Sequence, residues 1–285
     1  MELFLNKLFI LFCLLTGILF SQDYQLIDQF EAFSEATSFA LSPQGYFYVS
    51  DNGSDEIIKL DSLGNQVIAY GGYGWRNGQF DYPIDVSLNT LSIFVTDKNN
   101  HSVQRFDKDL NFISRLYTRD RDNESSFGFP MSADVSTMGD LFVLDSENKR
   151  ILKFDIFGKF VLKFGGFEDG DFSIRDPKKL IVTENNNVMV LDGQNLMIFD
   201  LFGNGLNITP LPENFSSIDK YYNTISLTGD SSIYVSSFEA NKLLFRKLLL
   251  PGLPDTGAFN ASLVVENRVY ALTNTSIYTF LLIEK

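Results

Sequence analysis

The sequence predicts an all-β protein folded as a six-bladed β-propeller with four-stranded antiparallel blades. Three markers recur along the 285 residues in one register. One Asp ends the second strand expected in each unit, another Asp ends the third strand, and a Pro closes the unit. These markers are Asp51, Asp97, Asp145 and Asp192; Asp61, Asp107, Asp155 and Asp200; and Pro83, Pro130 and Pro177. Four-stranded units of about 45 residues are typical of propeller blades.

Within each unit, short strands alternate with tight turns. In the first unit we expect strands at residues 38–42, 46–50, 56–60 and 66–70. The turns between them contain Gly45 and Gly64, and glycine turns recur at Gly158 and Gly203. Glycine suits such turns because it tolerates left-handed backbone angles. After residue 22, no stretch sustains the 3.6-residue hydrophobic period of a helix.

Six units account for the chain after residue 22. The blades are expected at approximately residues 37–83, 84–130, 131–177, 178–219, 220–255 and 256–285, with inner strands beginning near Thr37, Ile84, Ala133, Lys179, Thr224 and Ala261. The last unit holds only three strands, and a strand-like segment at residues 24–30 precedes the first unit. We expect this segment to complete the last blade and close the ring, because a ring of five blades would leave unpaired strand edges.

Residues 1–22 are predicted to be a signal peptide. Lys7 is followed by an uncharged apolar run from Leu8 to Phe20, and then by the small residue Ser21. As a helix this run would span about 20 Å, which is shorter than the hydrocarbon core of a membrane. Cleavage near Ser21 or Gln22 would leave residues 23–285 as one secreted or periplasmic domain without stable membrane insertion. The alternative is an N-terminal membrane anchor.

The net charge argues against one class of partner, and the cysteine content bears on how the domain is stabilised. The net charge is −13, and an acidic protein repels phosphate backbones, so no nucleic-acid partner is expected. The only cysteine, Cys13, lies in the predicted signal peptide. The domain must therefore be stabilised by its core without disulfides. We expect a monomer.

Several segments resemble the NHL repeat, which is named for Asn-His-Leu. Residues 95–107 look like the core of this repeat, with Ser102 in place of the Leu, and residues 148–155 match it with Lys149 in place of the His. The glycine-rich loop 71–83, which ends in Gln-Phe and then a Pro, resembles the inter-blade loop of the family. The resemblance implies a six-bladed propeller. The functions of this family range from RNA and protein binding to a peptide-processing lyase, so the resemblance implies no single activity.

The sequence contains no multi-residue catalytic set. His101 is the only histidine, and it belongs to the repeat motif. The lyase branch of the family needs a metal held by several histidines, so its activity is not expected here. The Asp residues that end the second strands recur in nearly every blade, and we expect them to hydrogen-bond the turn backbone.

No cofactor is expected, and calcium is the alternative. Asp85 and Asp134 follow closing prolines and begin inner strands, so both are weak candidates for calcium ligands at the central channel. Lactonase-like propellers hold calcium in this way. Lys178 and Lys179 are expected at a similar height in the channel, and their positive charge disfavours a cation there.

The candidate binding surface is the face that collects the turns between second and third strands together with the inter-blade loops 71–83, 117–130 and 165–177. These loops differ between blades, and variable loops on a rigid scaffold usually carry binding. Exposed aromatic and Arg side chains are typical interface anchors. The candidate ligand-binding residues are Tyr73, Trp75, Arg76, Tyr82, Arg119, Arg121, Phe167 and Arg175. We expect four other loop aromatics to fill gaps between blades instead: Phe80, Phe127, Phe129 and Phe172.

The leading hypothesis is a secreted, non-enzymatic binding or scaffold protein that presents a protein, peptide or glycan site on this face. It rests on predicted export, on a rigid repeat scaffold and on the missing catalytic set. The alternative is a calcium-dependent hydrolase or lactonase-like enzyme with its site at the central channel. A purely architectural role in an envelope complex is the third hypothesis.

Overall fold

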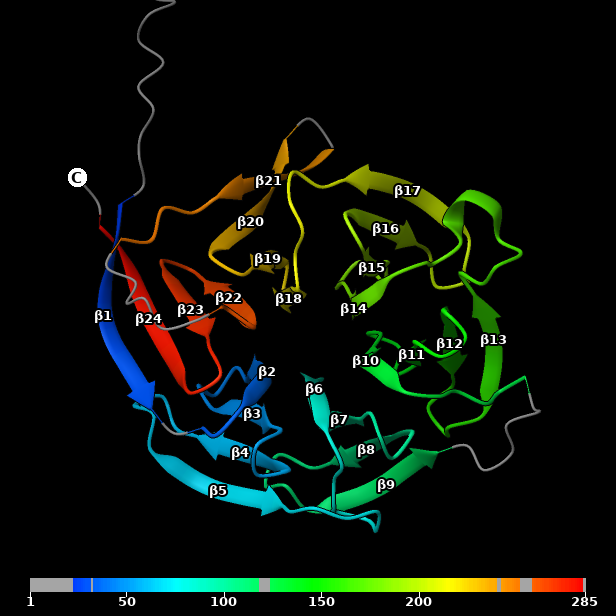
Figure 1. Cartoon of the computed structure of the whole chain (residues 1–285), viewed down its shortest axis with the longest axis horizontal. Coiled ribbons are helices and arrows are strands. Elements are labelled where there is room, and N and C mark those ends of the chain that lie inside the picture. The colour runs from blue at the N-terminus through cyan, green and yellow to red at the C-terminus, as the bar shows by residue number, and fades with distance from the viewer. Residues whose placement is uncertain (1–22, 32, 118–123, 240–241, 252–257, 284–285) are drawn as a thin grey trace, which may run out of the picture.

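The computed structural model confirms the predicted propeller, and Figure 1 shows its six blades arranged in a ring around a central axis. The structure describes residues 23–31, 33–117, 124–239, 242–251 and 258–283. The predicted signal peptide, residues 1–22, lies outside these residues. Among the described residues, no helix is long and apolar enough to span a membrane.

Each blade is a four-stranded antiparallel sheet. The first blade consists of β2 (Ala36–Leu41), β3 (Phe47–Asp51), β4 (Glu56–Leu60) and β5 (Gln66–Gly71). The second consists of β6 (Pro83–Leu88), β7 (Ile93–Asp97), β8 (Ser102–Phe106) and β9 (Phe112–Tyr117). The third consists of β10 (Pro130–Val135), β11 (Leu141–Asp145), β12 (Arg150–Phe154) and β13 (Phe160–Phe164).

The fourth blade consists of β14 (Pro177–Val182), β15 (Val188–Asp192), β16 (Asn195–Phe199) and β17 (Gly205–Pro210). The fifth consists of β18 (Ser217–Tyr221), β19 (Thr224–Gly229), β20 (Ser232–Glu239) and β21 (Lys242–Lys247). The sixth combines β22 (Ala261–Val265), β23 (Arg268–Leu272) and β24 (Ser276–Ile283) with the N-terminal strand β1 (Asp23–Glu31). A short 3₁₀ turn, η1 (Gly170–Phe172), lies in the loop between β13 and β14.

The fifth blade begins earlier than the sequence predicts. Its first and innermost strand is β18, which begins at Ser217, whereas the repeat pattern places the inner strand near Thr224 and the blade boundary after residue 219. Residues 235–237 accordingly lie in β20, the third strand of this blade. The pattern failed here because this unit carries neither the closing Pro nor the second-strand Asp of the earlier units.

Burial explains the composition of the strands. The second strands of the first four blades, β3, β7, β11 and β15, are buried along their whole length. Their sequences are nearly continuous apolar runs because neighbouring blades cover both faces. The outermost strands β5, β9 and β13 are instead exposed or half-buried at every position except the buried Phe164, since one edge of each strand faces solvent.

The predicted ring closure by the N-terminal strand is confirmed. Strand β1 pairs antiparallel with β24, and the register places Tyr24 opposite Leu282 and Phe30 opposite Ile277. Tyr24 and Phe30 are both buried. The first and last strands of the chain therefore share one blade, as Figure 1 shows, and the sheet edge that three strands would leave open is covered.

The Asp residues at the ends of the second strands hold the preceding inter-blade loop. The carboxylate of Asp51 accepts hydrogen bonds from the backbone N–H groups of Ser34 (2.8 Å) and Glu35 (2.7 Å). Asp192 accepts from Arg175 and Asp176 in the same way. We expected these carboxylates to bind the backbone of the turn that follows each strand. Asp51 does accept a hydrogen bond from Gly53 in that turn (3.1 Å), but it accepts more from the preceding loop. These carboxylates are therefore part of the framework.

Aromatic side chains fill the spaces between blades, as expected for three of the four loop residues. Phe80 and Phe127 are buried, and the Phe172 ring packs 5.5 Å from Phe199. Phe129 is the exception, because 39% of its surface is exposed. The expectation that Phe129 fills a gap is wrong, because the backbone turns at this residue with a φ of 46°.

Candidate functional site

The candidate site lies on the loop-rich face, which we define by inter-blade loops 72–82, 124–129 and 165–176 and the strand turns 98–101 and 146–149. Backbone hydrogen bonds join each turn to the loop before it. Lys98 donates to the carbonyl of Tyr82 (3.1 Å), and Glu147 donates to that of Gly128 (3.2 Å). The meander topology therefore brings loops and turns to one face, as predicted.

The backbone of loop 72–82 is fixed by side chains of the second blade. The Gln104 side chain accepts from the N–H of Gly78 (2.8 Å) and donates to the carbonyl of Gln79 (2.7 Å). Arg115 donates to the carbonyl of Trp75 (2.6 Å), and Asn100 donates to that of Gly74 (2.8 Å). Tyr73 also forms an isolated β-bridge with Phe80. This loop is thus held at several points although it contains three glycines.

The same loop exposes three of the predicted residues. Tyr73 is 66% exposed and Trp75 is 72% exposed, and Arg76 is exposed beside them. Two large aromatic side chains on a backbone with fixed position lose little conformational freedom when they bind a partner. The fixed backbone therefore presents Tyr73, Trp75 and Arg76 together, and we call these three residues the aromatic platform.

Tyr82 occupies a different position from the aromatic platform. It is half-buried and lines a hollow of about 340 Å³ at the mouth of the central channel, together with Glu35, Met131 and Lys178. Its backbone has a φ of 68°, and the Lys98 ammonium lies 5.5 Å from its ring. Tyr82 is thus a wall of the channel mouth rather than part of the loop tip.

The remaining predicted residues do not join one contiguous site. Phe167 is 96% exposed and Arg175 is exposed, but both belong to the loop between β13 and β14. Figure 1 places that loop and the loop between β5 and β6 in different sectors of the ring. Arg119 and Arg121 lie outside the described residues. Only Tyr73, Trp75 and Arg76 are brought together on one loop.

The single histidine has a structural contact. The Nδ1 atom of His101 accepts a hydrogen bond from the backbone N–H of Phe129 (2.9 Å), and the two rings meet edge to face at 4.4 Å. His101 thus joins its turn to the next inter-blade loop. Phe129 is an exposed aromatic that sequence reasoning excluded from the binding face. No local signal separates it from buried Phe127, which precedes it by two positions.

Asp97 anchors the loop that carries the aromatic platform. Its carboxylate is fully buried and accepts hydrogen bonds from the N–H of Asp81 (2.9 Å) and from the Asn100 amide (2.7 Å). Burial raises the pKa of Asp97 to about 6, against the lowering effect of these hydrogen bonds. The charged form therefore costs stability at neutral pH, although it fixes the loop.

This shift predicts a specific pH dependence. Because the pKa of folded Asp97 exceeds the ordinary value, the stabilising contribution of its protonated form is complete below the unfolded pKa. That contribution is lost as the pH rises toward 6. Relative to Asp97→Asn, the free energy of unfolding of the wild type should fall by about 2 kcal/mol between about pH 4 and pH 7. Urea titrations at several pH values measure this difference, and parallel profiles would contradict it.

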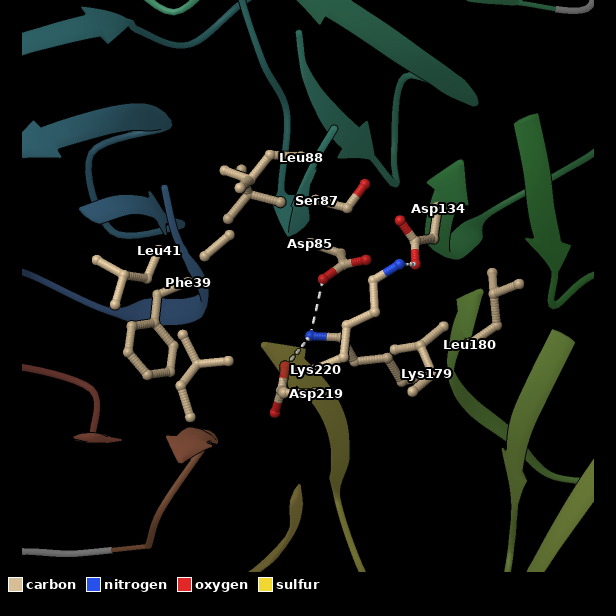
Figure 2. A pocket seen from close by; sticks show the side chains of 14 residues that line it. Phe39, Leu41, Asp85, Ser87, Leu88, Asp134, Lys179, Leu180, Asp219 and Lys220 are labelled. Carbon is tan, nitrogen blue, oxygen red and sulfur yellow. Dashed lines mark hydrogen bonds and ion pairs between the residues drawn. The ribbon is translucent and has the colours of Figure 1, made fainter. Parts of the chain in front are cut away.

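The central channel contains a ring of polar side chains from the innermost strands, and Figure 2 shows its charged members. Lys179 Nζ lies 2.9 Å from Asp85 and 2.7 Å from Asp219. The hydroxyls of Ser38 (2.8 Å) and Ser132 (2.7 Å) donate to the two oxygens of Asp85. Burial alone would lower the pKa of Lys179, but Asp219 and Asp85 outweigh it and hold that pKa above its usual range. The lysine is therefore charged and paired.

Asp134 has a separate partner set. Lys220 Nζ lies 2.6 Å from its Oδ2 atom, and the N–H of Val182 donates to the same oxygen (2.7 Å). Only a cavity of about 50 Å³ remains between these side chains. Among the described residues, no group of three or more Asp, Glu, His or Cys side chains converges. To bind Asp85, a calcium ion would have to displace the ammonium group of Lys179. To bind Asp134, it would have to displace that of Lys220.

Comparison with known proteins agrees with this geometry. Residues 80–106 match the model of the NHL repeat. The chain is 30% identical over 143 residues to Protein brain tumor of Drosophila melanogaster and 28% identical over 139 residues to the B-box type zinc finger protein ncl-1 of Caenorhabditis elegans. These matches cover 48% and 47% of this chain, but only 13% and 16% of those longer proteins.

Solved structures show the same architecture along most of the chain. A streptogramin B lyase aligns over 91% of this chain and 98% of its own, with a TM-score of 0.63 and 13% identity. A catalytically inactive virginiamycin B lyase from Staphylococcus aureus, solved with quinupristin, aligns over 92% of this chain and 100% of its own, with a TM-score of 0.63 and 9% identity. At such identity the likeness shows the fold alone. The six closed blades make this chain a six-bladed β-propeller, one segment of which, residues 80–106, matches the NHL repeat.

Proposed function

We propose that this chain is a non-enzymatic binding protein whose loop-rich face presents a site for a protein, peptide or glycan. The observation that carries the proposal is the aromatic platform, in which Tyr73 and Trp75 are exposed on a loop fixed by Gln104, Asn100 and Arg115. Trp, Tyr and Arg are the residue types that most often dominate binding energy at protein interfaces. A protein or peptide ligand is therefore favoured over a glycan.

The side chains that could act in catalysis or bind a metal are engaged in structural hydrogen bonds and ion pairs, which supports a binding role. His101 accepts a backbone hydrogen bond, and the carboxylates of Asp85 and Asp134 pair with lysines. The proposal includes export through residues 1–22, a monomeric state and a partner other than nucleic acid, in keeping with the net charge of −13.

Substitution of the platform tests this function. Peptides selected from a displayed random library on the purified protein should bind a Tyr73→Ala/Trp75→Ala variant at least about 30-fold more weakly than the wild type, because the two anchors together contribute about 2 kcal/mol or more. Isothermal titration measures the affinity, and circular dichroism checks the fold. A printed glycan array, read with the same two proteins, tests the glycan alternative.

A matched control separates the platform from exposed aromatics in general. Phe157 is 87% exposed in a turn on the opposite face, so Phe157→Ala should leave the affinity unchanged. If the double variant bound the selected ligands as tightly as the wild type, the assignment of the site to loop 72–82 would be wrong.

A further inference from the structure

A groove between the fourth and fifth blades opens on the face opposite the aromatic platform. It has a volume of about 560 Å³ and is walled by the turn between β14 and β15, by β16 and β17, by the turn between β18 and β19, and by β21. This volume lies within the range of typical small-molecule sites. We call it the blade 4–5 groove. The platform and the channel ring contribute no residue to it.

The groove exists because the repeat changes at this interface. The fourth residue of the third strand is Lys59 in blade one and Lys153 in blade three, and each ammonium reaches a carbonyl in the fourth-strand turn of the next blade, Lys108 (2.8 Å) and Leu201 (3.1 Å). In blade four the equivalent residue is Ile198, which lines the groove. Only two residues, 240 and 241, separate β20 from β21 in blade five, so the sequence has no room there for the five-residue Asp-x-x-x-Asn segment of blades one, two and four.

The lining is neutral and combines hydrogen-bonding walls with an apolar floor. The polar side chains are Thr183, Asn185, Asn187, Asn207, Thr209 and Asn223. The apolar side chains include Met189, Ile198 and Ile225. Within the described part of the chain, no hydrogen bond engages the side-chain amides of Asn185, Asn187 or Asn223. Each such amide offers both donors and acceptors to a ligand.

Tyr222 supplies an aromatic ring at the rim. It is 54% exposed, and the Tyr221 ring meets it at 4.9 Å and 90°, which fixes its orientation. Tyr222 begins the two-residue loop between paired Tyr221 and Thr224 with a φ of 51°, a position where glycine is usual. A bulky residue in this conformation is a genuine outlier, and such outliers cluster at ligand sites.

We propose that the blade 4–5 groove binds a neutral oligosaccharide. The absence of charged side chains from its lining fits an uncharged ligand. Amides with paired donor and acceptor atoms match the hydroxyl groups of a sugar, which also donate and accept. The apolar floor and the Tyr222 ring match its C–H faces. A peptide would share the hydrogen bonds, but the preoriented, exposed ring of Tyr222 favours a sugar.

Methyl NMR of methionine-labelled protein tests this proposal. An array of neutral oligosaccharides identifies the strongest binder, which is then titrated into the purified protein. The Met189 methyl signal should shift, whereas that of Met131, which lines the channel mouth, should not. If no neutral oligosaccharide bound, or if only Met131 responded, the proposal would be overturned. Neutral tripeptides that shift Met189 where sugars fail would overturn the assignment of the ligand class.

Two variants and a control sharpen the result. Tyr222→Gly removes the ring and suits the left-handed backbone, so the thermal stability should not fall while the sugar affinity drops about tenfold. Ile198→Lys places the cation of blades one and three inside the groove and should abolish binding. Phe202→Ala alters an aromatic residue that is 76% exposed on the same face but lies beside Lys153, and it should bind normally. Unchanged affinity in Tyr222→Gly and Ile198→Lys would refute the site.

Discussion

Replacing Lys179 with methionine is expected to lower the free energy of unfolding by about 3 to 5 kcal/mol. The substitution leaves Asp85 and Asp219 without the ammonium group that both contact, and these carboxylates are only 2% and 4% exposed. A buried charge without its partner keeps the full cost of leaving water. Urea unfolding at neutral pH, followed by circular dichroism, measures the loss.

The neighbouring lysine supplies the matched control. Lys178 pairs with Asp176 at 2.9 Å, but the side chains of this pair are 38% and 63% exposed. Lys178→Met should therefore cost less than about 1 kcal/mol. Adding Asp85→Asn and Asp219→Asn to Lys179→Met should recover much of the lost stability, because no unpaired charge remains. If Lys179→Met alone stayed within about 1 kcal/mol of the wild type, the ring would not contribute as argued.

In the channel ring, the sequence predicted the position of one charged residue but not the pairing of the side chains. Ser38, Asp85, Ser132, Lys179 and Asp219 are each the third residue of an innermost strand. The repeat register was therefore sufficient to place Asp85 at the axis. Pairing could not be predicted, because it depends on the direction of each side chain across the ring. Asp219 was also missed, because the fifth blade lacks the closing Pro that marks the start of earlier inner strands.

For the loops, too, the position could be predicted from the sequence but the local conformation could not. The position of loop 72–82 followed from strand counting, since meander topology fixes which connections share a face. Its rigidity depends on Gln104 and Arg115, which belong to the next blade and are distant in sequence. The same limit explains Phe129, whose exposure follows from a left-handed backbone and a contact with His101 rather than from local hydrophobicity. The blade 4–5 groove was predictable only as a departure from the repeat at Ile198.

The N-terminal strand is predicted from the repeat count alone, and its contribution to stability can be measured directly. Phe30→Ala should lower the free energy of unfolding by about 3 to 5 kcal/mol. The Phe30 ring is 8% exposed, meets Phe47 of the first blade at 6.2 Å, and lies so close to Gly64 that an added Cβ there would approach it to 2.4 Å. This side chain therefore joins the blade that closes the ring to the blade that follows it.

Ile27 lies on the same strand and provides the control. Because 43% of its surface is exposed, Ile27→Ala should change the free energy of unfolding by less than about 0.5 kcal/mol. Hydrogen exchange should show faster opening of the β1 and β24 amides in Phe30→Ala than in Ile27→Ala, since the pairing of these strands closes the ring. If both variants unfolded at the same urea concentration as the wild type, β1 would be a covering strand and not the closure that the propeller depends on.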